Sequence, residues 1–93
     1  MIIGTCVVYL QAEWVTSLKE KRMVVKSIIE KAKHKFNISI AEVEEQDRHK
    51  IIAIGFACVS NEVSHANSII DNVINFIEKS TDAVILDTVI EIL

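Results

Sequence analysis

The stretch TSLKEKRMVVKSIIEKAKHKF, residues 16–36, decides the fold, because it has the periodicity of one long amphipathic helix. Apolar residues recur in it at the three- and four-residue spacing that places them on one side of a helix: Leu18, Val25, Ile28, Ile29, Ala32 and Phe36. Thr16 or Ser17 is a suitable N-cap, and Ser17 followed by Glu20 forms a capping-box pattern. The sequence therefore predicts a helix over residues 17–35 with one side against a core.

The same helix carries seven of the ten Lys and Arg residues of the chain. At about 100° per residue, four of them fall within about 60° of one another along one flank of the apolar side. These four residues form the basic stripe: Lys19, Arg22, Lys26 and Lys33. The other three lie on the opposite flank: Lys21, Lys31 and Lys35.

The charge of this helix contrasts with that of the rest of the chain. Residues 17–36 carry a net charge of +5, whereas the whole chain carries −3, so the remaining residues carry −8. A basic helix on an acidic domain would attract phosphate groups or an acidic protein. Lys is also a good helix former, however, so a solvated helix surface without a partner is the alternative.

Four β-rich segments surround this helix and a second helical segment. Residues 2–14 alternate between an apolar even set, which runs from Ile2 to Trp14 and is predicted to face the core, and a more mixed odd set on the second face. Residues 50–60 alternate in the same way. Residues 38–45 form a third strand, in which the apolar parity changes after Ile40 and indicates a β-bulge or an edge position. A last strand is predicted over residues 83–93, with five residues facing the core: Val84, Leu86, Thr88, Ile90 and Ile92.

The second helix is predicted to run from an N-cap at Ser60 or Asn61 to about Lys79. Asn37 is suited to end the first helix in a left-handed conformation. The order β-α-β-β-α-β, in a single domain of residues 1–93, is typical of the split βαβ, or ferredoxin-like, α+β sandwich. In this fold two helices cover one face of a four-stranded antiparallel sheet. Right-handed crossovers place the first and third strands, the two most apolar, in the middle.

The other face of this sheet has no helix left in the chain to cover it. Alternation along the two central strands predicts the residues on this open face: Thr5, Val7, Tyr9, Ala53, Gly55 and Ala57. The face is flat and semi-apolar, so it is a candidate dimer interface or a surface with room for a small ligand. Tyr9 is the only aromatic residue expected there, which disfavours RNA recognition by stacking of bases on the sheet.

No catalytic or nucleotide-binding motif occurs in the chain, and no residue is assigned to catalysis. Cys6 and Cys58 lie in apolar strands without CxxC spacing, so we expect buried free thiols rather than zinc ligands. The acidic residues 42–47 lack EF-hand spacing, and the three histidines lie on separate segments. We therefore expect no enzymatic activity, metal or cofactor. The absence of a long apolar segment and of a signal peptide predicts a cytoplasmic protein that does not cross a membrane.

SLKEKR at residues 17–22, FNISIAEV at residues 36–43, the acidic loop that follows and the strand ending at Ser60 carry a resemblance to a known family. Over essentially its whole length the chain resembles the YlxP-like family of small bacterial proteins, whose function is unknown. It departs from that resemblance at Trp14, where a small residue, Gly or Pro is expected.

The resemblance implies a ferredoxin-like fold in a bacterial cytoplasmic protein. Genes of similar proteins lie beside those of transcription-termination, translation-initiation and ribosome-maturation factors, so the resemblance also implies an association with rRNA or the ribosome. It implies no catalytic residue.

Three functions of different class are therefore compared. The first is an RNA- or ribosome-associated binding factor whose basic stripe contacts phosphate oxygens, with salt-sensitive and sequence-independent affinity. The second is a non-catalytic homodimeric interaction module, which dimerises through the open face and binds an acidic partner with its basic helix. The third is a small-ligand-binding domain, because the flat strip of Ala53, Gly55 and Ala57 leaves room for a ligand on the open face and the fold does not by itself determine a function.

Overall fold

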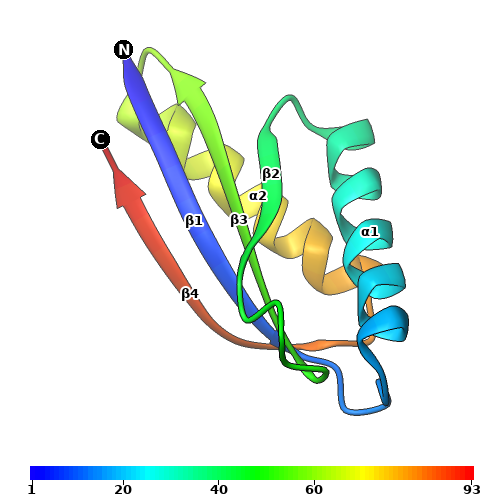
Figure 1. Cartoon of the computed structure of the whole chain (residues 1–93). Coiled ribbons are helices and arrows are strands. Elements are labelled where there is room, and N and C mark those ends of the chain that lie inside the picture. The colour runs from blue at the N-terminus through cyan, green and yellow to red at the C-terminus, as the bar shows by residue number, and fades with distance from the viewer.

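The computed structural model describes all of residues 1–93 and contains six elements in the order β-α-β-β-α-β (Figure 1). They are β1 (Ile2–Gln11), α1 (Leu18–Lys35), β2 (Ser39–Glu44), β3 (Ile51–Ser60), α2 (Val63–Ser80) and β4 (Val84–Ile92). All strand pairs are antiparallel, and the sheet order is β2-β3-β1-β4. The predicted ferredoxin-like architecture is confirmed, including the central position of β1 and β3.

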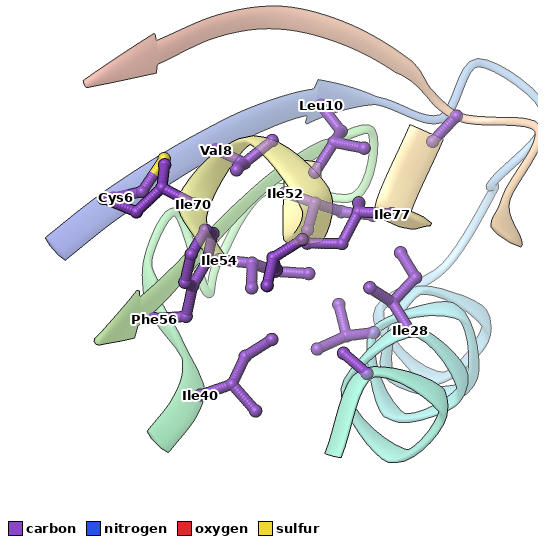
Figure 2. Close-up of a cluster of buried hydrophobic side chains, with 14 of the residues drawn as sticks. Cys6, Val8, Leu10, Ile28, Ile40, Ile52, Ile54, Phe56, Ile70 and Ile77 are labelled. Atoms are coloured by element: carbon purple, nitrogen blue, oxygen red, sulfur yellow. The ribbon is translucent and has the colours of Figure 1, made fainter. Parts of the chain in front are cut away.

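The hydrophobic core lies between the sheet and the two helices. The even residues of β1 from Gly4 to Leu10 are all buried, as their alternation predicts. Figure 2 shows Ile70 and Ile77 of α2 and Ile28 of α1 directed toward side chains of the two central strands. Each fully buried aliphatic side chain of this kind stabilises the fold by about 1.5–3 kcal/mol relative to an exposed one.

The start of α1 is fixed by a displaced capping box. Ser17 is the N-cap, and its Oγ accepts a hydrogen bond from the Glu20 backbone N–H at 3.1 Å. The Glu20 carboxylate accepts from the backbone N–H of Thr16 at 2.7 Å, rather than from that of Ser17 as in a regular capping box. The Ser17 side chain thus satisfies an N–H group that the first turn leaves without a helical partner, and the Glu20 side chain satisfies the N–H group of the residue just before the N-cap.

The end of α1 differs from the prediction. The chain leaves the helix at Phe36 in an extended conformation, and Asn37 does not adopt a positive φ. The Phe36 ring packs edge-on against Phe76 of α2 with ring centroids 5.5 Å apart. The Phe36 N–H still donates to the Ala32 carbonyl at 2.8 Å, and the chain then continues directly into β2 without a left-handed cap.

The start of α2 also differs from the prediction. Its N-cap is Glu62, which makes no side-chain cap bond, rather than Ser60 or Asn61. The hydroxyl of Ser60 instead accepts a hydrogen bond from the Glu62 N–H at 3.1 Å, so it organises the turn before the helix.

Both edge strands contain irregularities. In β2 the pairing with β3 shifts between Glu42 and Glu44, which leaves Val43 as the extra residue. β2 therefore has both the bulge and the edge position predicted as alternatives, but the bulge lies at Val43 and the pairing just after Ile40 is regular. In β4 the pairing with β1 shifts next to Leu86, and the side-chain phase inverts there. Val84 and Leu86 are therefore 64% and 52% exposed, against the prediction that they face the core, and Ile85 packs against the core instead.

The first strand ends at Gln11 rather than continuing to Trp14. Ala12 is still buried and its N–H donates to the Lys50 carbonyl at 2.7 Å, but residues 13–14 then form a turn. Trp14 is 45% exposed in this turn, so its predicted position in the core is wrong. A bilayer-crossing helix is absent, since neither α1 nor α2 contains a sufficiently apolar stretch.

Candidate functional site

The basic stripe lies on the solvent side of α1. All four of its residues are exposed. Lys26 approaches the Glu30 carboxylate at 3.9 Å with 76% of its side chain exposed, and the other three make no ion pair. Exposed pairs of this kind contribute little, so the stripe remains a row of solvated cations. The opposite flank of α1 faces α2, since Lys31 on that flank donates a hydrogen bond to the carbonyl of Ser80, the last residue of α2, at 3.5 Å. The basic stripe therefore faces away from α2.

Lys21 is the one basic residue of α1 that is buried, with 1% exposure. Its predicted position on the flank of Lys31 and Lys35 is therefore wrong. Lys21 falls in the same helical phase as three buried residues, which are Val25, Ile28 and Ala32. The sequence does contain a signal for this burial: Lys21 precedes the core residues Val25, Ile28 and Ala32 by four, seven and eleven residues, which places all four on one side of the helix.

The ammonium group of Lys21 connects α1 to β2 and to the turn that follows it. Its Nζ lies 3.2 Å from Oε2 of Glu42 and donates a hydrogen bond to the backbone carbonyl of Glu45. Oε2 of Glu42 is buried and accepts no hydrogen bond. The positive charge of Lys21 therefore compensates for the water that this oxygen has lost. The two segments that carry the family resemblance, residues 17–22 and the acidic loop after residue 43, therefore meet in one tertiary contact.

Glu45 is held in a conformation that presents its carbonyl to this contact. Its φ of 63° makes it the only non-glycine residue with positive φ, a region that costs L-residues on the order of 1 kcal/mol or more. The backbone N–H of Arg48 donates to the same carbonyl at 3.1 Å, and the Arg48 guanidinium donates to the Glu45 carboxylate at 3.2 Å. This arrangement organises the β2–β3 turn, which indicates a structural role for Lys21.

The open face of the sheet contains five of its six predicted residues at partial exposure: Thr5, Val7, Tyr9, Gly55 and Ala57. Ala53 is fully buried, so its predicted exposure is wrong. Tyr9 on β1 and Glu44 on β2 both pair with Ala53, and the Tyr9 hydroxyl donates to Glu44 Oε2 at 2.9 Å across it. This hydrogen bond is the main reason that the pKa of Tyr9 is raised above its ordinary value.

The bulge residue Val43 covers the strip of small residues on β3. A Cβ atom added to Gly55 would lie 2.8 Å from Cγ1 of Val43, so the valine side chain lies directly above the glycine. It therefore occupies much of the space that Gly55 was expected to leave for a ligand. A shallow depression of about 290 Å³ remains between this valine and the Thr5 and Val7 side of β1.

Exposed apolar residues cross the remaining open face in two rows. In the first row Ile3 pairs with Val59 and exchanges backbone hydrogen bonds with Leu93, and these two neighbours are 64% and 65% exposed. In the second row Val7 lies between Gly55 and Val89, which is 49% exposed. These open-face apolar rows extend across the sheet, whereas the Tyr9 end of the face is polar.

The nucleophilic and metal-ligating residues do not form a reactive cluster. Cys6 and Cys58 are buried free thiols, as predicted, and burial raises the pKa of Cys6 from 9.0 to about 11. The Ser60 hydroxyl lies 2.9 Å from Nδ1 of His65, but it also accepts the Glu62 N–H and belongs to the turn before α2. No three His, Cys, Asp or Glu side chains are grouped as a metal site.

These features define the class of protein: a small ferredoxin-like α+β sandwich with an exposed basic helix and one uncovered sheet face. The chain belongs to the DUF503 family, described as proteins of unknown function, whose family model matches residues 3–90. It is 39% identical over 62 residues to the uncharacterized protein YlxP of Bacillus subtilis (strain 168), and the match covers 67% of each chain. The sequence resemblance to the YlxP-like family is thus confirmed.

The fold is also similar to that of a solved structure, the de novo designed protein Foldit4. The TM-score is 0.52 at 10% identity, and the match covers 99% of this chain and 94% of that one. This similarity concerns the fold alone.

Proposed function

We propose that this protein is a non-catalytic cytoplasmic factor that associates with RNA, such as the rRNA of the ribosome, through the basic stripe of α1. The supporting observation is that four cations lie exposed in one row without strong ion-pair partners, while the chain outside residues 17–36 carries −8. From Lys19 to Lys33 the row extends about 21 Å along the helix axis. It is therefore long enough to follow several phosphate groups of one strand.

Such contacts give affinity without reading sequence, because lysine and arginine interact with phosphate oxygens rather than with base edges. Four phosphate contacts on a single strand correspond to a slope of about −3 in a plot of log K against log salt concentration. The affinity of one domain is expected to be modest for the same reason. The acidic remainder of the surface would repel RNA elsewhere, so binding should be confined to α1.

The experiment measures anisotropy of a labelled RNA oligonucleotide and ribosome co-sedimentation at low and moderate salt. The test variant reverses three charges of the stripe: Lys19→Glu, Arg22→Glu and Lys26→Glu. The matched control reverses three exposed charges outside it: Lys31→Glu, Lys35→Glu and Lys79→Glu. Both variants change the net charge equally, and circular dichroism verifies that they are folded.

We expect the test variant to lose binding and the control to retain most of it. Equal losses in the two variants would show that net charge, not the stripe, governs binding. Binding by the wild type that does not change with salt concentration would contradict the proposal.

A second candidate function is homodimerisation through the open face, supported by the open-face apolar rows. The four strands have 10, 6, 10 and 9 residues, and at about 3.3 Å per residue and about 4.8 Å per strand they give a face on the order of 550 Å² in projection. Stable interfaces bury about 800 Å² per partner, so the face is close to the required size. A second copy suits it because both surfaces would be flat sheets with the same rows of apolar residues.

Light scattering coupled to size-exclusion chromatography tests this candidate. Val59→Lys combined with Val89→Lys places two charges in the open-face apolar rows and should yield monomers. The matched control, Val63→Lys combined with Leu86→Lys, alters two apolar residues that are 48% and 52% exposed outside those rows, and should remain dimeric. Dissociation of the control alone would place the interface elsewhere, and a monomeric wild type would contradict dimerisation.

A further inference from the structure

A groove separates the start of α1 from the segment that follows α2. Figure 1 shows these two segments at the same end of the molecule, beside the turn between β1 and α1. The groove has a volume of about 360 Å³, within the range of small-molecule sites. Its apolar wall is formed by Trp14, Met23 and Val24, and its polar residues include Ser27, Ser80 and Asp82.

Two large apolar side chains of the groove are exposed rather than buried in the core. Trp14 is 45% exposed and Met23 is 67% exposed, although both are large enough to stabilise a core by burial. Met23 lies four residues after Lys19 and three before Lys26, so all three are neighbours on the surface of α1. Met23 therefore forms the rim between the basic stripe and the groove, and the groove itself lies on the side of α1 that faces Ser80.

We infer that this groove receives an unstacked base of single-stranded RNA, an inference that rests on the proposed function of the stripe. Proteins that bind single strands combine a positively charged track for the backbone with aromatic side chains on which bases stack. Here Lys19 and Lys26 provide the track, and the indole of Trp14 provides the stacking surface in the groove that Met23 borders. A duplex keeps its bases stacked, so it would contact the stripe alone.

The polar residues of the groove are suited to the edge of a base rather than to a phosphate group. The Glu20 carboxylate is engaged by the backbone N–H of Thr16 at 2.7 Å. Asp82 is exposed and makes no ion pair, so its carboxylate is available to accept hydrogen bonds. Bases present N–H donors on their Watson–Crick edges, whereas phosphate would be repelled by this carboxylate. The strand is therefore expected to place its phosphates on the stripe and to turn one base inward across Met23.

Trp14 is the only tryptophan of the chain, so its intrinsic fluorescence reports on this groove alone. The experiment titrates the protein of residues 1–93 with a fluorescently labelled RNA single strand of mixed sequence, with the same strand in a duplex, and with an abasic strand of equal length. Anisotropy of the label measures binding in each case, and a parallel titration with unlabelled strands measures Trp14 fluorescence.

We expect quenching by the base-containing single strand, and binding without quenching by the abasic strand and the duplex. Trp14→Ala should weaken single-strand binding roughly 5- to 150-fold, as observed for stacking contacts in general, and should leave duplex binding unchanged. Trp14→Phe retains an aromatic ring and should restore most of the affinity, which separates loss of stacking from loss of folding.

Anisotropy-detected binding of the single strand with unchanged Trp14 fluorescence would overturn the inference while leaving the proposed function of the stripe intact. Equal weakening of single-strand and duplex binding by Trp14→Ala would overturn it as well. Absence of binding to every RNA would overturn both the inference and the proposed function.

Discussion

Replacing Lys21 by methionine tests the contact that connects α1 to the β2–β3 turn. Methionine retains an unbranched apolar side chain in a position with 1% exposure, and it removes the ammonium group. The substitution leaves Oε2 of Glu42 buried without its counter-ion and removes one donor from the Glu45 carbonyl. The free energy of unfolding should therefore fall.

Removal of one partner from a buried ion pair generally costs about 3–5 kcal/mol. Two observations place Lys21→Met at the lower end of this range. The side chain of Glu42 retains 20% exposure and gains some solvation, and the Glu45 carbonyl keeps the Arg48 N–H as a donor. We expect a loss of about 3 kcal/mol, which in a domain of this size lowers Tm by about 15 °C.

Urea unfolding followed by far-UV circular dichroism measures this loss. Lys33→Met is the matched control, because Lys33 is exposed on the same helix without an ion pair and should change stability by less than about 0.5 kcal/mol. Lys21→Met combined with Glu42→Leu should recover most of the stability, because apolar residues commonly replace a buried pair at little cost. A loss below about 1 kcal/mol for Lys21→Met, or a double variant no more stable than the single one, would refute the reasoning.

Four further predictions concern local structure and the core. Ser17→Ala should lower the free energy of unfolding by about 1 kcal/mol through loss of the N-cap hydrogen bond, measured by urea titration; no change would contradict its role as the cap. Gly55→Ala should cost about 1–3 kcal/mol because the new Cβ would lie 2.8 Å from Val43, and Val43→Ala in the same chain should restore most of that loss. The pKa of Cys6 is raised from 9.0 to about 11 in the folded state. The contribution of this thiol to the free energy of unfolding is therefore complete below pH 9 and is lost as pH rises toward 11. Urea midpoints between pH 8 and 11 should therefore fall more steeply for the wild type than for Cys6→Ala, and parallel curves would refute this. Phe56→Ala should cost about 3–5 kcal/mol in thermal unfolding, since this ring is 3% exposed; a shift typical of a surface substitution would contradict its place in the core.

The elements and their order follow from local patterns in the sequence. Apolar residues of period two in residues 2–11 and 51–60, and of helical period in residues 18–35 and 63–80, suffice to predict the two central strands and the two helices. The handedness of the crossovers then places β1 and β3 in the middle of the sheet. The basic stripe is equally a property of sequence, because the helical period determines which lysines share a flank.

Exposure at single positions was decided by the tertiary structure, because it depends on segments distant in the chain. Lys21 is buried because the turn at Glu45, 24 residues later, presents a carbonyl to it. Ala53 is buried because Tyr9 and Glu44 form a hydrogen bond across it from the two neighbouring strands. Trp14 has the parity of the core but is exposed, because the strand ends three residues before it. Periodicity describes one element at a time, whereas these side chains are covered or left open by contacts between elements.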